Sequence, residues 1–513
     1  MELELNKEPV FISEVIFDGQ TEQGVEFDYV LPDYYPDIFK ILNFTLTPGI
    51  VSYNVSGTQL HLDGVAHINV MYLSENSTVI HCVEHKYTYS KTVDLVRSGE
   101  KHTVSFAPKV DYCNCRAVSG RRLDMRGAVS YKIRVTDVKQ TEMISHAEGL
   151  EMKKMPITYC GDKLVASRQF AVREDIETGM GKGGIQNIIH RDAVAEVTDI
   201  KVIANKVVVK GEVKLKALYL VKNADDKQDS EVMEAVIPVS QIIDVDGIDD
   251  GHVCYVRLSV MDCDLDIKAN EMGENRMFGC DMMLDCTITA SKENTISLLT
   301  DVYSTQYETA FTKSTIKTEY SPQVINRQLS LKSELQCGEG ELTEVFDGRC
   351  EISNVMCRVN EEGTLVVTGQ CAASAMGRLE NGAPVFLEKS EPFEISAESV
   401  GEEGCAIEPD LQVGSVSYSI TGDNNVELRI ILELNGCLFG VRSVEAINEI
   451  EIDTEKPKEK NNDYALKLYF AEENEEIFAI AKHYNTSAAA IMAENELDAE
   501  VTAEPCMLLI PIV

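Results

Sequence analysis

The chain has 513 residues, of which 44% are hydrophobic and 26% charged, and its formal net charge at pH 7 is -38. This length predicts about three or four folded domains, and the composition is that of folded protein. The acidic balance argues against nucleic acid and anionic membrane surfaces as partners, because both require a basic face. It favours a basic protein partner, or it simply keeps the chain in solution.

The N-terminal residues give no sign of export. Met1-Glu-Leu-Glu-Leu-Asn lacks the basic start and the apolar stretch of a secretory signal. No run approaches the roughly 20 apolar residues of a membrane-spanning helix, so we expect no transmembrane segment. The protein is expected to remain in the cytosol of the cell that makes it.

The cysteines are scattered and odd in number, 15 in all. Cys113 and Cys115 are one residue apart, and no Cys-x-x-Cys pair occurs. In a cytosolic protein this pattern predicts reduced, mostly buried thiols rather than a disulfide framework.

In chain order, most of the sequence before residue 454 alternates polar and apolar residues in short runs separated by turn residues. Such alternation with β-branched residues, as at 206–220, predicts antiparallel strands with one face in water. Two segments depart from it. Apolar residues at i, i+3 and i+4 predict short helices at 36–42 and 184–189.

Each predicted helix precedes a repeated pattern of strand, turn, strand and glycine. The copies lie at 50–64 and 198–211, and a third copy at 352–369 keeps the helix poorly. Gly64 and Gly211 are 147 residues apart, and Gly211 and Gly369 are 158 residues apart. These repeat lengths are too long for a solenoid and fit duplicated domains.

We therefore predict a mainly β protein of three tandem, sandwich- or barrel-like domains with short helices. Their predicted boundaries are 1–150, 151–310 and 311–453. Residues 454–463 contain no apolar residue, which predicts a flexible charged linker. A small module follows at 464–513.

The C-terminal module has its own pattern. A short strand is predicted at 464–470, and apolar residues at helical spacing predict a helix at 477–484. Thr486 or Ser487 can cap a second helix, and the apolar run 508–511 predicts a closing strand. The expected order is strand, helix, helix, strand.

Residues 31–42, Leu-Pro-Asp-Tyr-Tyr-Pro-Asp-Ile-Phe-Lys-Ile-Leu, and the three strand–glycine units resemble the SPOCS (spore coat) domain of endospore-forming Firmicutes. Residues 481–486, Ala-Lys-His-Tyr-Asn-Thr, with Leu-Leu-Ile-Pro at 508–511, resemble a LysM domain. Repeated SPOCS copies followed by LysM resemble the family of SipL-like spore morphogenetic proteins. The resemblance implies a role in coat assembly, with the LysM domain contacting the coat ATPase called stage IV sporulation protein A.

LysM domains usually bind N-acetylglucosamine glycans such as peptidoglycan, and the resemblance implies that two loops grip the ligand. Residues 461–513 contain ten acidic residues and two lysines, which favours a protein partner with a basic patch over a sugar. A merely solvated acidic face is the simpler interpretation. The predicted binding residues are Glu473, Asn474, Glu475, Glu476, Asn495, Glu496, Leu497 and Asp498.

No sequence motif points strongly to a catalytic or binding site, and we predict no catalytic, cofactor or metal site. The glycine-rich loop 177–184 has Gly183 after Lys182, where a phosphate-binding loop needs Ser or Thr, so it is interpreted as a mobile linker. His81 and His85 lie in a strand-like run, where they would be about 13 Å apart, too far to share a metal. No Gly-x-Ser-x-Gly elbow occurs.

The function predicted from the sequence is a non-enzymatic scaffold in the mother-cell cytosol, at the forespore surface, with the coat ATPase, other coat proteins or itself as partners. One alternative is a peptidoglycan-binding protein of the wall or cortex. Another is a hydrolase, which would need a deep pocket of convergent polar groups in one copy.

Overall fold

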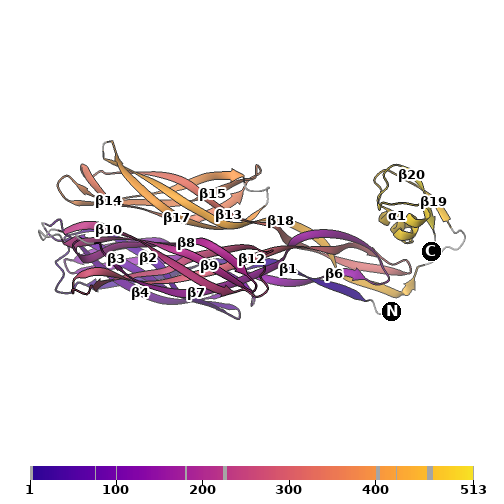
Figure 1. Ribbon diagram of the computed structural model, residues 1–513, viewed down its shortest axis with the longest axis horizontal. Helices are drawn as coiled ribbons and strands as arrows, with labels where there is room; N and C mark the ends of the chain where they lie inside the picture. The colour runs from indigo at the N-terminus through magenta and orange to yellow at the C-terminus, as the bar shows by residue number, and fades with distance from the viewer. Residues whose placement is uncertain are drawn as a thin grey trace.

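The computed structural model describes residues 4–75, 77–99, 101–179, 182–222, 228–399, 405–422, 424–458 and 466–511. These residues confirm a mainly β protein, with two short helices near the C-terminus (Figure 1). The strands before residue 458 fall into three consecutive sets of six, which we call repeats 1, 2 and 3.

The strands of repeat 1 are β1 (Leu5–Val30), β2 (Lys40–Ser56), β3 (Gln59–Leu73), β4 (Ile80–Asp94), β5 (His102–Ser119) and β6 (Arg122–Ala147). Those of repeat 2 are β7 (Glu151–Glu177), β8 (Gly184–Ile203), β9 (Lys206–Lys222), β10 (Gln228–Asp244), β11 (Val253–Ala269) and β12 (Asn275–Tyr303). Those of repeat 3 are β13 (Tyr307–Gln336), β14 (Leu342–Val359), β15 (Thr364–Leu379), β16 (Pro384–Ser399), β17 (Ala406–Thr421) and β18 (Asn425–Pro457).

All three repeats have the same strand connectivity. In each repeat the sixth strand pairs with the first and the fifth, and the third strand pairs with the second and the fourth. All these pairs are antiparallel. Apolar side chains from the two sheets enclose one core in each repeat. Each repeat is therefore a β-sandwich of two three-stranded sheets.

The first and sixth strands of each repeat are 26 to 33 residues long and extend beyond the sandwiches. Their outer halves form three two-stranded ribbons that wind around one another, and we call this part the stalk (Figure 1). Turns at 148–150 and 304–306 join one ribbon to the next. Side chains from all three ribbons share one apolar cluster: Val10, Met143, Ile157, Tyr159, Leu298, Ile316, Val444 and Ala446.

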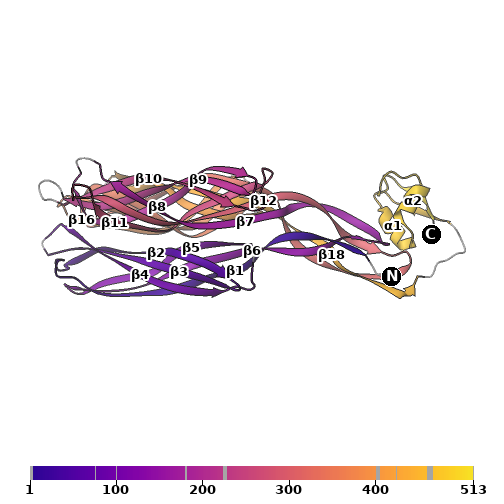
Figure 2. The same ribbon diagram turned by 60° about the horizontal axis from the view of Figure 1, so that its bottom comes forward.

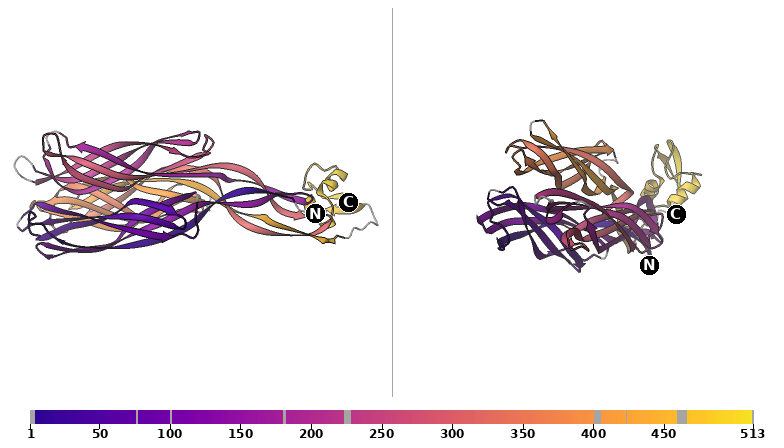
Figure 3. Two further views of the ribbon diagram at one scale, coloured as in Figure 1. Left: turned by 90° about the horizontal axis from the view of Figure 1, so that it is seen from below. Right: turned by 60° about the vertical axis from the view of Figure 1, so that its left-hand side comes forward.

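The three sandwiches lie side by side about the long axis of the molecule rather than end to end (Figure 3). A second apolar cluster joins them away from the stalk. Its members include Met71 of β3, Leu218 of β9 and Met376 of β15. These positions are separated by the same 147 and 158 residues as the repeated glycines. Equivalent residues of the three repeats thus meet at one place, and the stalk and sandwiches together form what we call the array.

The predicted helices at 36–42 and 184–189 are wrong. Residues 40–42 belong to β2, and residues 184–189 open β8. In β8, bulges follow Ile185 and Ile188, and each bulge shifts the alternation of faces by one residue. Ile185 and Ile188 therefore enter the core of repeat 2, while Ile189 enters the cluster between repeats. A bulged strand buried on both faces produced the spacing that indicated a helix.

The repeated glycines stand where a neighbour leaves no room for a side chain. A Cβ on Gly64 would lie 2.4 Å from the ring of Tyr89, its cross-strand partner. On Gly369 it would lie 2.8 Å from the ring of Phe393, which is again the cross-strand partner. On Gly211 it would lie 2.6 Å from the backbone oxygen of Glu196. Close cross-strand packing explains why the strand–glycine pattern recurs.

We expect Gly211→Ala to lower the free energy of unfolding by about 1–3 kcal/mol, because the backbone of β8 must move to admit the methyl group. Gly24→Ala is the matched control, since no atom lies within 4 Å of a Cβ built there. Urea unfolding of both variants checks this expectation. Equal stability of the two variants would contradict it.

The C-terminal module consists of β19 (Leu466–Ala471), α1 (Ile477–Tyr484), α2 (Ala488–Glu494) and β20 (Cys506–Pro511), with β19 paired to β20. Ser487, one of the two predicted caps, accepts a hydrogen bond from the amide of Ala490 and begins α2. Among the described residues, no helix is long and apolar enough to span a membrane.

The linker predicted at 454–463 needs correction at its start. β18 extends to Pro457, so residues 454–457 belong to the stalk. The rest of the predicted linker lies outside the described residues, apart from Lys458. Lys458 donates hydrogen bonds to the backbone oxygen of Ser304 and to Asn485 of the module, both at 2.9 Å. The polar composition of 454–457 had obscured a strand whose side chains are mostly exposed.

Candidate functional site

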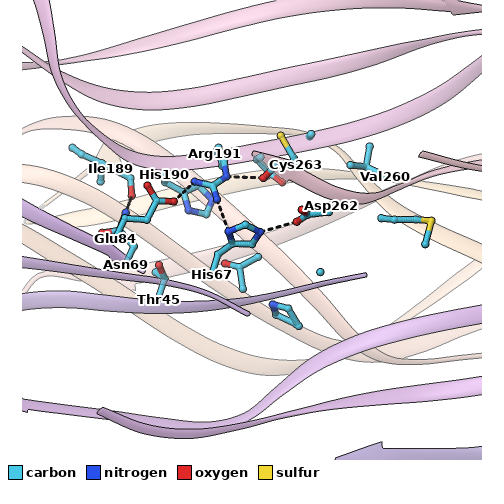
Figure 4. A pocket seen from close by; sticks show the side chains of 16 residues that line it. Thr45, His67, Asn69, Glu84, Ile189, His190, Arg191, Val260, Asp262 and Cys263 are labelled. Carbon is cyan, nitrogen blue, oxygen red and sulfur yellow. Dashed lines mark hydrogen bonds and ion pairs between the residues drawn. The ribbon is translucent and has the colours of Figure 1, made fainter. Parts of the chain in front are cut away.

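A polar pocket of about 150 Å³ lies between repeats 1 and 2 (Figure 4). Strands β2, β3 and β4 supply one wall, and β8 and β11 supply the other. Arg191 of β8 lies at the centre of its hydrogen bonds, and its side chain is only 12% exposed. The guanidinium donates to Glu84 Oε1 at 2.5 Å and to the backbone oxygen of Cys263 at 2.7 Å.

Arg191 also determines the state of His67. Its Nη2 lies 2.7 Å from His67 Nδ1, and a guanidinium can only donate, so Nδ1 is the acceptor. His67 Nε2 then carries the proton and donates to Asp262 Oδ1 at 2.7 Å. His67 and Glu84 belong to repeat 1, whereas Arg191, Asp262 and Cys263 belong to repeat 2. The network therefore ties two repeats together.

Ligand atoms of His67, Glu84 and Asp264 lie within 4.8 Å of one another, which is close enough for a metal site. Here each of them already has a cationic partner. Arg191 contacts all three, with Nη2 at 3.6 Å from Asp264 Oδ1, and Lys86 pairs with Asp264 as well. A metal ion would have to displace the guanidinium, so the chemistry of these donors fits an ion-pair network between repeats rather than a metal centre.

The carboxylate of Asp264 gives this network a pH dependence. Burial acts to raise the pKa of Asp264, but the hydrogen bond from Lys86 and the charges of Lys86 and Arg191 hold it below its usual value. Since the pKa is lower in the folded than in the unfolded chain, the ionised group stabilises the fold above about pH 4. That contribution is lost as the pH falls through the lowered pKa.

We expect Asp264→Asn to destabilise the chain by about 2 kcal/mol at pH 7, because Lys86 loses its partner and Arg191 loses one of its two carboxylates. The difference from the unchanged chain should shrink below about pH 4, where Asp264 itself becomes neutral. Asp199→Asn, which breaks an exposed pair with Lys210, is the control. Urea unfolding between pH 3 and pH 7 measures both; a pH-independent difference for Asp264→Asn would contradict the expectation.

Repeats 2 and 3 are joined in a related way. A cavity of about 350 Å³ lies between them, and at its edge Asp347 of β14 pairs with Lys216 of β9 and with Arg349, each at 2.6 Å. Arg349 follows Arg191 by the same 158 residues that separate the repeats. Equivalent strands thus place an arginine at both interfaces.

A third ionic contact involves all three repeats. Lys163 of β7 has a side chain that is 7% exposed. Its Nζ donates to Ser13 of β1 at 2.6 Å and to Glu319 of β13 at 3.1 Å. It also lies 4.9 Å from the ring centre of Phe439 in β18. Lys163 therefore contacts strands of all three repeats.

Other candidate motifs lie apart from these networks. His81 and His85 both belong to β4, as the strand-like pattern predicted. In the glycine-rich loop 177–184, Lys182 pairs with Glu231 at 2.7 Å, and residues 180 and 181 lie outside the described residues.

The first predicted binding loop follows β19 and lies beside the segment before β20. Asn474 donates its amide to the backbone oxygen of Thr502, and Ile477 to that of Glu500, both at 2.9 Å. The carboxylate of Glu475 is used inside the loop, where it accepts from the Tyr469 hydroxyl at 2.5 Å and from the Glu472 amide at 3.0 Å. Glu475 therefore shapes the loop rather than facing a partner.

The second predicted loop is fixed by Asn495. Its side chain donates to the backbone oxygens of Ile491 and Leu509 and accepts from the Leu509 amide at 2.7 Å. Leu497 packs against the apolar core of the module. Of the eight predicted residues, those with exposed side chains are Glu473, Asn474, Glu496 and Asp498.

Glu476, the remaining predicted residue, points toward the array. It pairs with Lys153 of β7, and Lys482 of α1 pairs with Asp301 of β12 at 2.6 Å. The buried hydroxyl of Tyr303 donates to the backbone oxygen of Thr486 at 2.7 Å. The module is thus held on the stalk through α1 and the turn after it (Figure 2). Sequence reasoning missed Tyr303, which nothing in the local pattern distinguishes from a core residue.

Of the comparisons with known proteins, the one with protein-family models found a match. The family model described as SipL, SPOCS domain matches residues 37–118 and 184–268. These segments run from just before β2 to the end of β5 and from β8 to near the end of β11, so they cover equivalent parts of repeats 1 and 2. No curated protein and no solved structure matches the chain.

Proposed function

We propose that this protein is a sporulation-related, non-enzymatic scaffold of endospore coat assembly, because segments of repeats 1 and 2 match the SPOCS domain model of SipL. The observation that carries the proposal is the way the repeats are joined. Equivalent residues of all three meet in shared apolar clusters, and buried ion pairs link each repeat to the next. Such an array presents a large continuous surface, which suits a protein that holds others in place.

The absence of enzymatic activity is part of the proposal. The charged groups at the centres of two contacts between repeats are engaged with one another: the guanidinium of Arg191 meets Glu84 and His67, and Lys163 meets Glu319. A catalytic acid, base or nucleophile needs a group free to face a substrate. This arrangement supports a structural role for the interfaces over a hydrolase.

We further propose that the C-terminal module is a LysM-like domain that binds the coat ATPase, a protein like stage IV sporulation protein A. The order β19, α1, α2, β20 and the acidic exposed residues of its loops support this assignment. Acidic loops favour a protein with a basic patch through charge complementarity. The protein would act in the mother-cell cytosol, at the forespore surface, where other coat proteins or further copies of the chain could join the array.

Co-purification from sporulating cells tests the proposal. A tagged full chain is expected to retain the coat ATPase, whereas a tagged chain ending at Lys458 should lose it and remain folded, as circular dichroism would show. Equal retention by both would refute the assignment to the module. Retention by neither would refute the proposed scaffold role.

The second candidate is a glycan-binding protein of the wall or cortex, which the strand, helix, helix, strand order of the module favours. It predicts that the full chain sediments with insoluble peptidoglycan and that the chain ending at Lys458 stays in the supernatant.

A further inference from the structure

One face of the small sheet in the module is apolar and exposed. The exposed fractions are 67% for Leu468, 60% for Phe470 and 56% for Met507. Leu468 lies opposite Leu509, and Phe470 opposite Met507, so the side chains form cross-strand pairs on a single face. The full set, which we call the apolar sheet face, is Leu466, Leu468, Phe470, Met507, Leu509 and Pro511.

This face is not part of the module's core. Ala471, Leu508 and Ile510 point to the other side of the sheet, where they pack with α1 and α2. A two-layered module normally presents polar residues on the outer face of its sheet. Here both faces are apolar, and a contiguous exposed apolar patch is typical of an interaction site.

The array does not cover the apolar sheet face. The module contacts the stalk through Glu476, Lys482, Asn485 and Thr486, all on α1 or the turns beside it. The exposed fractions of Leu468 and Phe470 are those of the module resting on the stalk. A partner could therefore bind the sheet without separating the module from the array.

Charge indicates which kind of partner fits. Glu472 follows β19 directly, Glu473 is next, and Glu504 precedes β20, so the end of the face at Ala471 has an acidic rim. The two lysines of the module's described residues are occupied: Lys482 pairs with Asp301, and Lys467 lies over the ring of Tyr484 on the opposite side of the sheet. A second copy of this face, or an anionic lipid surface, would bring like charges together.

We propose that the apolar sheet face is the docking surface for a partner protein that presents an apolar patch rimmed by basic side chains. Phe470 and Leu468 are the anchors, since exposed aromatic and large aliphatic side chains dominate the energy of such contacts. The acidic rim speeds association and excludes acidic competitors. The inference rests on the proposed function only in that the module binds a protein. It assigns the apolar anchors of that binding to the sheet, and of the eight loop residues predicted from the sequence only Glu473 belongs to its rim.

The test uses the full chain, with the purified coat ATPase as the probe. Leu468→Asn with Phe470→Asn should weaken binding at least about tenfold without changing the melting temperature, because both side chains are exposed. The matched control is Val96→Asn with Met272→Asn, which removes two apolar side chains that are 85% and 86% exposed outside the module. It should bind as the unchanged chain does.

A second variant probes the rim. Glu472→Gln with Glu504→Gln should weaken binding at low salt and should reduce its dependence on salt concentration. Salt dependence equal to that of the unchanged chain would overturn the basic rim of the proposed partner.

The outcomes separate this inference from the proposed function. If the sheet-face variant binds normally while the chain ending at Lys458 does not bind, the apolar sheet face is not the docking surface. The assignment of binding to the module then still stands. If the unchanged chain itself does not bind, the proposed function fails. If the unchanged chain self-associates, or binds peptidoglycan, and the sheet-face variant does not, the choice of a basic protein partner is overturned.

Discussion

Replacing Arg191 with methionine is expected to lower the free energy of unfolding by about 3–5 kcal/mol. The substitution leaves Glu84 and Asp264 without their central cation and removes the donors to His67 and to the backbone oxygen of Cys263. A buried charge that loses its partner costs far more than an exposed pair gains. Urea unfolding followed by circular dichroism measures the effect.

Arg173→Met is the control for this prediction. Arg173 pairs with Asp281 across β7 and β12, but its side chain is 78% exposed, so its removal should cost less than about 1 kcal/mol. If the Arg191 and Arg173 variants unfold at the same urea concentration, the pocket between repeats 1 and 2 does not stabilise the array.

Replacing Lys163 with methionine should be comparably destabilising, by about 3–5 kcal/mol, and should affect all three repeats. Burial acts to lower the pKa of Lys163, but Glu319 raises it above its usual value, so the ammonium group is charged in the fold. Without that group Glu319 loses its cationic partner, and Ser13 of repeat 1 loses its hydrogen bond to repeat 2. Thermal unfolding and limited proteolysis of the full chain would report the loss.

The double variant Lys163→Met with Glu319→Gln should recover part of this stability, because Glu319 then no longer leaves an unpaired charge at this contact. Lys210→Met, which removes an exposed partner of Asp199, is the control and should be nearly neutral. A double variant no more stable than the single one would show that the ion pair is not the cause.

The β class and the threefold repetition could be predicted from local pattern alone. Alternation of polar and apolar residues predicted the strands. The recurring glycines predicted separations of 147 and 158 residues between repeats, and Met71, Leu218 and Met376, which meet in one apolar cluster, have these same separations. The helix at 184–189 was mispredicted because bulges in β8 shift the alternation by one residue and imitate helical spacing. In the helix predicted at 36–42, residues 36–39 precede β2, and the bulge of β2 follows Ile41.

The way the repeats pack together was harder to infer. The run Ala-Leu-Tyr-Leu-Val at 217–221 indicates that this strand packs against the other repeats, because a strand with no polar face is buried on both sides. Tyr219 and Val221 enter the core of repeat 2, whereas Leu218 and Leu220 face the other repeats. The partners of Arg191 come from residues 67, 84 and 263, and no spacing rule relates such distant positions.

The roles of the loop residues in the C-terminal module were also hard to infer from the sequence. The resemblance to LysM directed attention to two loops, but Glu475 and Asn495 stabilise the module and Glu476 contacts the array. The alternation of Leu468 and Phe470 was visible in the sequence. Only the structure shows that these residues face outward, because α1 and α2 cover the other side of the sheet.

The most direct test of the account is to measure binding of the purified full chain to the coat ATPase and to insoluble peptidoglycan under the same conditions. We predict saturable binding to the ATPase that disappears when the chain ends at Lys458, and no retention on peptidoglycan. Retention on peptidoglycan without binding to the ATPase would contradict the proposed scaffold function.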